Sequence, residues 1–87
     1  MPSVPFEHPP DGALLLEDGR RVAIEIQRSI ENYTVLDEIL LDLLEHYAEV
    51  YYFTTEPVYP VLLEARSRLN PNQQAQITVY PVLKEKD

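Results

Sequence analysis

The 87-residue sequence predicts an α/β fold of the α+β kind, with helices on a mixed β-sheet in the order β-β-α-β-α-β. Three observations lead to this prediction. Asp18-Gly19 separates two strand-like runs, an apolar stripe with helical spacing follows, and the remaining strand–helix–strand pattern is typical of right-handed parallel crossovers. We therefore expect one antiparallel pair at the start of the sheet and parallel strands after it.

The first two strands are predicted over residues 13–17 and 21–27. Asp-Gly between such runs favours a tight hairpin, because both central residues of that turn need positive φ. Side chains alternate along the second strand, with Val22, Ile24 and Ile26 on one face and Ala23, Glu25 and Gln27 on the other. Polar residues that alternate with a small one are typical of a solvent-facing side, so we expect Glu25 to be exposed. It needs a partner or a metal only if that face is covered.

A helix is predicted from about residue 31 to 47, with Ser29 or Asn32 as its cap. Its apolar stripe consists of Tyr33, Leu36, Ile39, Leu40, Leu43, Leu44 and Tyr47. Residues 31–49 also hold six carboxylates and no Lys or Arg. We interpret them as a solvated acidic helix face, and a docking surface for a basic partner is the alternative.

A central strand is predicted over residues 50–55, because the run is β-branched and aromatic. Thr54 or Thr55 can cap a second helix, with Pro57 or Pro60 in its first turn.

Asn70-Pro71-Asn72 ends that helix, since the residue before a proline avoids the helical region. A last strand is predicted over residues 75–80, and Pro81 indicates that it lies at an edge of the sheet.

Residues 11–83 are expected to form a single domain, after an extended or disordered arm over 1–10 and before a charged tail over 84–87. A chain this short has a thin core, so we expect a homodimer or a larger parent protein to cover part of its surface. The sequence has no cysteine, no apolar run long enough to span a bilayer and no signal peptide. We expect a cytoplasmic protein without membrane contact.

The net charge is −8, with 15 acidic and 7 basic residues. Nucleic-acid binding requires a basic footprint on the phosphates. We therefore expect the chain alone to bind DNA weakly, if at all. A local basic patch could form only from Arg20, Arg21, Arg66 and Arg68.

Few residues could carry chemistry, and the two histidines, His8 and His46, have no partner at a useful spacing. Asp11 and Glu25 remain. They stand about equally far from the Asp18-Gly19 turn, so the hairpin brings both to its open end. Two carboxylates held together either raise a pKa or bind a hard divalent cation. Mg²⁺, with Mn²⁺ as its substitute, suits such a pair because it takes one or two carboxylates and keeps several waters.

Pro10-Asp11, the hairpin and Glu25-x-Gln27 resemble the PD-(D/E)xK signature of the restriction-endonuclease-like superfamily. The resemblance implies a truncated core of that fold, with Asp11 and Glu25 as Mg²⁺ ligands and Gln27 as the third catalytic position. A closer resemblance is to the replication-relaxation family of plasmid and mobile-element proteins. The segments that carry it are Pro9-Pro10-Asp11-Gly12, Asp18-Gly19-Arg20-Arg21-Val22-Ala23-Ile24-Glu25-Ile26, Arg28-Ser29 and Tyr51-Tyr52-Phe53-Thr54.

Gln27 stands where the superfamily has a lysine, and the only lysines, Lys84 and Lys86, lie in the tail. Arg28, one residue on, points to the other face of the strand. Glutamine can orient a water but cannot take its proton at neutral pH. The resemblance therefore implies a small nuclease-like domain with a degenerate Mg²⁺ site, inactive or weakly active as a phosphodiesterase. Its setting would be DNA processing, or the replication and mobilisation of plasmids and mobile elements.

Two other interpretations stay open. Asp11 can start the hairpin with its carboxylate accepting backbone N–H bonds, and Glu25 can be an exposed strand residue. Alternatively, the chain is a non-catalytic interaction or dimerisation module that uses the acidic helix and a tyrosine-rich surface. Most of the tyrosines fall on apolar stripes, so we expect them in the core; they are Tyr33, Tyr47, Tyr51, Tyr52, Tyr59 and Tyr80.

Overall fold

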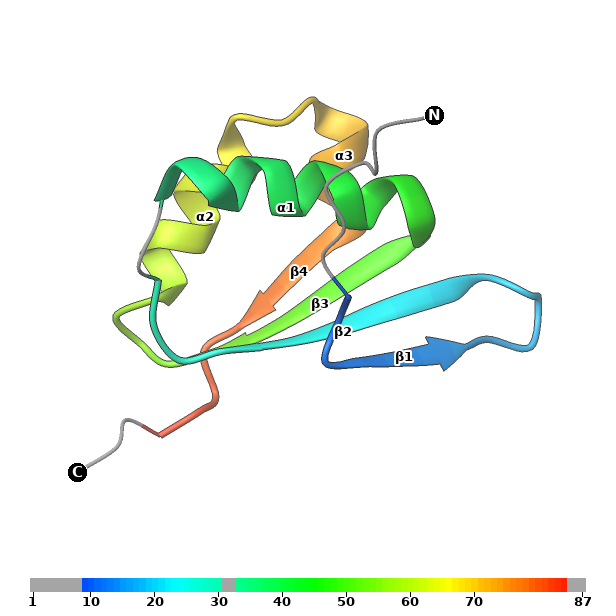
Figure 1. Cartoon of the computed structure of the whole chain (residues 1–87), viewed down its shortest axis with the longest axis horizontal. Helices are drawn as coiled ribbons and strands as arrows, with labels where there is room; N and C mark the ends of the chain where they lie inside the picture. Colours follow the sequence, from blue (N-terminus) through cyan, green and yellow to red (C-terminus); the bar gives the residue numbers. More distant parts are fainter. Residues whose placement is uncertain (1–8, 31–32, 85–87) are drawn as a thin grey trace, which may run out of the picture.

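The computed structural model describes residues 9–30 and 33–84. Within these ranges the chain forms a four-stranded mixed sheet and three helices, which confirms the predicted α+β class (Figure 1). The elements are β1 (Gly12–Leu15), β2 (Arg21–Gln27), α1 (Tyr33–His46), β3 (Glu49–Thr54), α2 (Tyr59–Ser67), α3 (Pro71–Gln76) and β4 (Ile77–Tyr80).

The strands lie in the order of the sequence, β1-β2-β3-β4. β1 and β2 pair antiparallel, and β2, β3 and β4 are parallel. The chain crosses over from β2 to β3 and then from β3 to β4 in the same direction, so its helices lie on the same side of the sheet (Figure 1). β3 is central and β4 is an edge strand that ends just before Pro81, as predicted.

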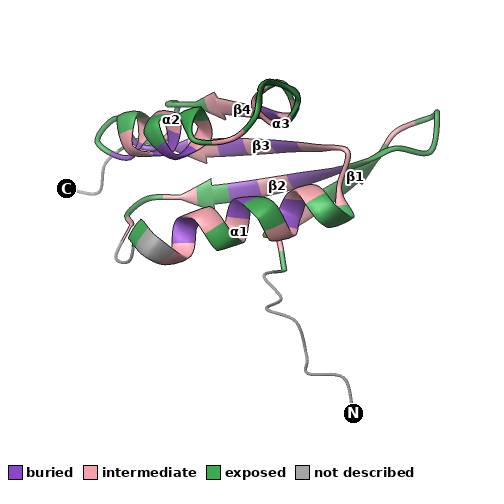
Figure 2. Cartoon of the chain, turned by 90° about the horizontal axis from the view of Figure 1, so that it is seen from above, coloured by how far each residue is buried: buried purple, intermediate pink, exposed green. Residues whose placement is uncertain are grey.

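The side of the sheet beneath the helices holds the hydrophobic core. Ala23, Val50, Tyr52 and Ile77 pack there against apolar residues of α1 and α2. The helices supply Leu36, Leu40, Leu43, Leu62 and Ala65. Burying one leucine side chain contributes about 1.5–3 kcal/mol, so this single layer supplies much of the stability of so short a chain. Figure 2 shows that the buried positions concentrate along β2, β3, α1 and α2.

The helices cover the side of β2 that carries Ala23 and Glu25, so the predicted exposure of Glu25 is wrong. Ala23 is completely buried and Glu25 is only 2% exposed. Alternation along a strand separates two faces, but it does not say which face the helices will cover. Here the smaller Ala23 lets the helix layer approach the sheet, and the larger Ile24 and Ile26 are left on the other side.

The opposite side of the sheet has no helix over it in the described part of the chain (Figure 1). It is nevertheless apolar: Leu14 is 50%, Ile26 44% and Tyr80 39% exposed. Phe53 stacks on Tyr80 with ring centres 5.2 Å apart, and Tyr51 meets Tyr80 edge-on at 6.1 Å. We call this surface, formed by Leu14, Ile24, Ile26, Tyr51, Phe53 and Tyr80, the open face.

The hairpin turn differs from the predicted two-residue turn. The Gly19 N–H donates to the Leu16 carbonyl at 2.9 Å, and the Leu16 N–H donates to the Arg20 carbonyl at 2.8 Å. Among the described residues, only Gly19 has positive φ, at 90°. This is a longer turn closed by a glycine bulge, and β1 consequently ends at Leu15 instead of reaching residue 17.

The predicted caps of α2 are also wrong, because that helix begins later, at Tyr59. Its first turn contains Pro60, and its cap residue, Val58, makes no side-chain cap bond. The Thr55 hydroxyl donates instead to the Arg28 carbonyl at 3.2 Å. The Thr54 hydroxyl is buried without a hydrogen-bond partner among the described residues. For α1, the predicted cap Asn32 lies outside the described residues.

The sequence around Asn70 was predicted to end α2, but it starts a further helix. α2 ends at Ser67, and Asn70 caps α3 by accepting the Gln73 N–H at 2.8 Å. α3 runs directly into β4, so that strand begins at Ile77 and not at residue 75.

The prediction that most tyrosines lie in the core is wrong. Tyr52 is the only fully buried one among the described residues, and Tyr33 is 59% exposed. The others are partly exposed: Tyr47, Tyr51, Tyr59 and Tyr80.

No helix among the described residues is long and apolar enough to cross a membrane.

Candidate functional site

The predicted site residues Asp11 and Glu25 lie together at the open end of the hairpin. Gly12 pairs with Ile24, so the register extended by one residue places Asp11 opposite Glu25, on the same side of the sheet. The Ile26 N–H donates to Asp11 Oδ2 at 2.7 Å and fixes this carboxylate beside β2. This bond is also expected if Asp11 only starts the hairpin and binds no metal. The metal-site interpretation and this purely structural interpretation therefore differ in what they expect of Glu25.

Glu25 is a buried carboxylate on the face that the helices cover. It is 2% exposed and stands next to Ala23 of the hydrophobic core. Burying a carboxylate costs several kcal/mol unless it is paired, hydrogen-bonded or coordinated. The interpretation of Glu25 as an exposed strand residue is therefore wrong, and its burial meets the condition under which a partner or a metal is required.

Tyr52 lies beside Glu25 on the next strand. In the parallel register of β2 and β3 the two residues are direct partners, and both face the helices. Burial, then the negative charges of Glu25 and Asp11, raise the pKa of the Tyr52 phenol far above its ordinary range. The phenol is therefore protonated at neutral pH, and its hydroxyl lies within electrostatic range of both carboxylates. Among the described residues it has no hydrogen-bond partner.

Gln27 continues the same face toward the carboxyl end of β2. It pairs in register with Thr54 and is partly buried. Its amide nitrogen donates to the Ser29 carbonyl, which fixes the orientation of the amide group. A neutral amide offers an oxygen acceptor but no base, so Gln27 can hold a water and cannot activate one.

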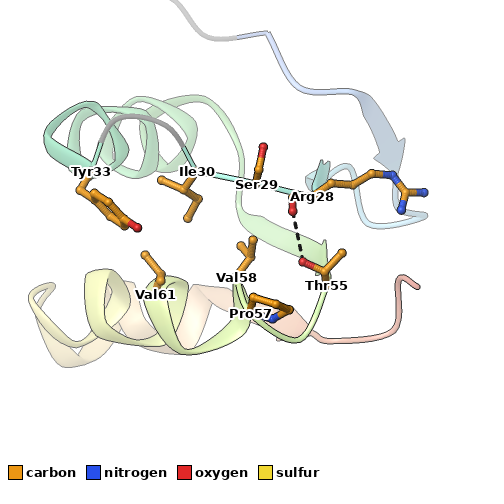
Figure 3. Close-up of a pocket in the computed structure, with 8 residues that line it drawn as sticks. All are labelled: Arg28, Ser29, Ile30, Tyr33, Thr55, Pro57, Val58 and Val61. Carbon is orange, nitrogen blue, oxygen red and sulfur yellow. Dashed lines mark hydrogen bonds between the residues drawn. The ribbon is translucent and has the colours of Figure 1, made fainter. Parts of the chain in front are cut away.

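Arg28 is directed away from this group of residues. Its Nη1 donates to the Lys84 carbonyl at 2.9 Å, and Figure 3 shows its side chain extending away from the other pocket residues. It therefore does not replace the missing lysine. The expectation that Arg28 points to the other face agrees with this geometry.

A pocket of about 370 Å³ opens just beyond the carboxyl ends of β2 and β3. This is the position at which open α/β sheets bind ligands. In Figure 3 the side chains of Ile30, Tyr33, Val58 and Val61 face one another across it. The complete lining is Arg28, Ser29, Ile30, Tyr33, Thr55, Pro57, Val58 and Val61. The pocket is mainly apolar and holds none of the three predicted site residues.

A second group of possible metal ligands lies at the end of α1, where sequence reasoning expected none. Ligand atoms of Asp42, Glu45 and His46 all lie within 4.8 Å of one another and could hold a metal ion. The His46 Nδ1 also lies 2.9 Å from the Asp42 carbonyl oxygen. Glu45 and His46 are exposed. Clusters of exposed acidic groups on a helix are common without any ion.

Two carboxylates of the acidic segment 31–49 are paired with arginines from other elements. Arg68 contacts Asp37 of α1 at 2.8 Å, and Arg20 contacts Glu49, which begins β3, at 3.0 Å. These pairs are well exposed, so each contributes at most about 1 kcal/mol. The pairs do, however, use two of the four arginines from which a basic patch could form.

Sequence reasoning did not single out Tyr52 and Thr54, which add two buried hydroxyls to the same face. The available signal was alternation along β3, where Val50, Tyr52 and Thr54 share one side. That signal could not be interpreted without knowing that the helices cover this side.

Comparison of the chain with protein-family models found no match, and searches of curated proteins and of solved structures found none either. The function is therefore inferred from the site geometry together with the sequence resemblance.

Proposed function

We propose that this chain is a nuclease-like domain that binds Mg²⁺ with Asp11 and Glu25 and is inactive or only weakly active in phosphodiester cleavage. The observation that supports it best is the burial of Glu25 directly opposite Asp11, on a face otherwise lined by the core. By its resemblance to replication-relaxation proteins, the domain would serve DNA processing or the replication and mobilisation of plasmids and mobile elements.

The residues present fit a hard divalent cation. Asp11 and Glu25 offer carboxylate oxygens and Tyr52 an uncommitted hydroxyl, and oxygen-only surroundings are what Mg²⁺ prefers. Asp11 is exposed while Glu25 is buried, so a cation can enter from solvent at Asp11 and reach the inner carboxylate. Bound there, Mg²⁺ would offset the charge that Glu25 brings into the core.

The same geometry supports low activity. A nuclease of this kind needs a group that assists the attacking water, and Gln27 cannot accept a proton from water at neutral pH. Arg28 is directed elsewhere. Lys84 is the only lysine among the described residues. It lies after β4, it is exposed, and its backbone carbonyl accepts a hydrogen bond from Arg28.

The test is a thermal melt of the wild-type chain with and without saturating Mn²⁺ in chelator-treated buffer. A ligand at about a hundred times its Kd stabilises by about 2.7 kcal/mol, a rise of about 10–20 °C in Tm for a domain of this size. We expect that rise in wild type and its loss in Asp11→Asn and Glu25→Gln. Asparagine can still accept the Ile26 N–H, so Asp11→Asn isolates the charge from the hairpin bond.

Asp42→Asn is the matched control, because it removes one carboxylate from the alternative cluster on α1. It should melt with the full Mn²⁺ response. If Asp42→Asn loses the response and Asp11→Asn keeps it, the ion binds on α1. If wild type shows no response, the metal site is not real.

The open face supports a second candidate function, a module that associates with a second copy of the chain. Apolar residues this exposed on a sheet are uncommon outside interaction sites. Among the described strand residues whose side chains lie on the open face, the only carboxylate is Glu49, which Arg20 contacts. The acidic residues of α1 and α2 lie on the other side of the sheet. Two copies of a chain with charge −8 can therefore meet at the open face with least repulsion. Its test is the oligomeric state of the chain.

A further inference from the structure

Tyr52 presents a buried polar atom that no described residue satisfies. The residue is completely buried and belongs to the core, yet its hydroxyl has no hydrogen-bond partner among the described residues. Buried hydroxyls are nearly always hydrogen-bonded, since leaving one without a partner is destabilising. Phenylalanine would fill the same space without that cost. The hydroxyl is explained if it binds something that the described residues do not supply.

The position of Tyr52 indicates what that is. It is the register partner of Glu25 on the covered face, and the charges of Glu25 and Asp11 both act on its phenol. Thr54, two residues further along the same face, has a second buried hydroxyl for which no described residue is a hydrogen-bond partner. Two such hydroxyls on one face, beside a buried carboxylate, form a polar interior at the end of the sheet where Asp11 lies.

We propose that Tyr52 is a positioning residue of the cation site, whose hydroxyl donates a hydrogen bond to a water that Mg²⁺ retains when Asp11 and Glu25 bind it. This inference rests on the proposed function. Mg²⁺ gives up its waters reluctantly, so a site with two carboxylates must also accommodate water. A phenol hydroxyl can donate its proton to a water oxygen held between anions. Groups that orient the ligands of a metal typically change its affinity by 10–100-fold.

The experiment measures the Mn²⁺ dissociation constant and the metal-free melting temperature of wild type, Tyr52→Phe and Tyr51→Phe. Tyr51 is the matched control, because it is adjacent in sequence, faces the opposite side of the sheet and directs its hydroxyl to Glu49 at 3.4 Å. We expect Tyr52→Phe to weaken Mn²⁺ binding by about tenfold or more. Its metal-free melting temperature should be unchanged or higher, since the unsatisfied hydroxyl is gone. Tyr51→Phe should keep the wild-type affinity.

The outcomes separate the inference from the proposal beneath it. If wild type binds Mn²⁺ and Tyr52→Phe binds it equally well, the hydroxyl is no part of the site and the inference is wrong. If Tyr52→Phe melts well below wild type without metal, the hydroxyl has a structural partner, and the inference is again overturned. If wild type itself binds no Mn²⁺, the proposed function is wrong, and the inference that rests on it is wrong as well.

Discussion

Glu25 and Tyr52 place polar atoms where the rest of the sheet face is apolar. Each occupies a position that a leucine or a phenylalanine could fill, so packing alone does not explain either residue. A buried charge is a weak source of stability, because desolvation offsets most of what its partners return. The proposed function accounts for its presence at such a position by a role in cation binding. The same reasoning gives no special role to the exposed carboxylates of α1.

Gly19 is the residue whose conformation depends most on its type. Its φ of 90° lies in the left-handed region, where a side chain is strained even though a Cβ there would meet nothing within 4 Å. We expect Gly19→Ala to lower the free energy of unfolding by about 1–2 kcal/mol. The measurement is the midpoint of urea unfolding.

Gly12→Ala is the control for this change. A Cβ at residue 12 would lie 3.7 Å from the Ile24 Cβ, an ordinary contact, and Gly12 has no positive φ. Its midpoint should stay close to wild type. Equal losses in both variants would mean that the turn conformation is not what Gly19 contributes.

At the scale of the elements, α3 shows how a short segment can set the position of a strand. It has six residues and none of them is buried, so packing does little to hold it. Its start is fixed by the capping box, in which Asn70 accepts the Gln73 N–H at 2.8 Å and the Asn70 N–H donates to Gln73 Oε1 at 3.2 Å. Because β4 follows without a loop, the cap also helps to fix where β4 begins.

Asn70→Ala should therefore destabilise the chain by about 1 kcal/mol and increase hydrogen exchange of the Gln73 amide. Asn72→Ala is the matched control, because Asn72 is an exposed asparagine in the same helix. Unfolding in urea and amide exchange measured by NMR together check both variants. Alanine has a higher helix propensity than asparagine, so Asn72→Ala should be neutral or slightly stabilising. If it costs as much as Asn70→Ala, the cap does not account for the loss.

At the scale of the whole molecule, the sheet is covered on one side only. The consecutive crossovers put the helices on one face, so no helix of the described chain covers the other face, although Val22 is completely buried there (Figure 1). A domain of this size buries a smaller fraction of its surface than a larger domain does, and association is the usual remedy. The charge of −8 acts against association except where acidic residues are absent. The open face is such a place.

We therefore expect the wild-type chain to sediment as a dimer at high micromolar concentration and Ile26→Lys to sediment as a monomer. A lysine in the middle of the open face would bring two like charges together across a twofold interface. Leu41→Lys is the control, because Leu41 is 46% exposed on α1, close to the 44% of Ile26. It should leave the dimer intact. A monomeric wild type contradicts the second candidate function without bearing on the metal site.

The net charge of −8 opposes the DNA binding that the proposed function includes. Two of the arginines outside the tail are engaged by Glu49 and Asp37, and a third lies over the Tyr47 ring at 4.7 Å. A bound divalent cation would add positive charge at Asp11 and Glu25, where the chain otherwise repels phosphate. We expect the domain by itself to recognise DNA only weakly.

The sequence determined the local order of this protein. Strict alternation located β2 at residues 21–27, helical spacing located α1, and the Asp11–turn–Glu25 spacing brought two carboxylates to one end of a hairpin. These features depend on contacts between near neighbours, which periodicity and turn chemistry encode directly. The existence of α3 was missed because Asn-Pro both ends and starts helices, and only the capping box distinguishes the two.

The tertiary structure alone decided which face of the sheet is inside. Val22, Ile24 and Ile26 gave the more apolar side of β2, yet the helices cover Ala23 and Glu25, since the direction of the crossovers and the close fit over a small residue outweigh the transfer energy of a few side chains. That choice buries Glu25, places Tyr52 beside it and leaves the open face to solvent. No alternation pattern within one strand contains this information, because it arises when the whole sheet meets its helices.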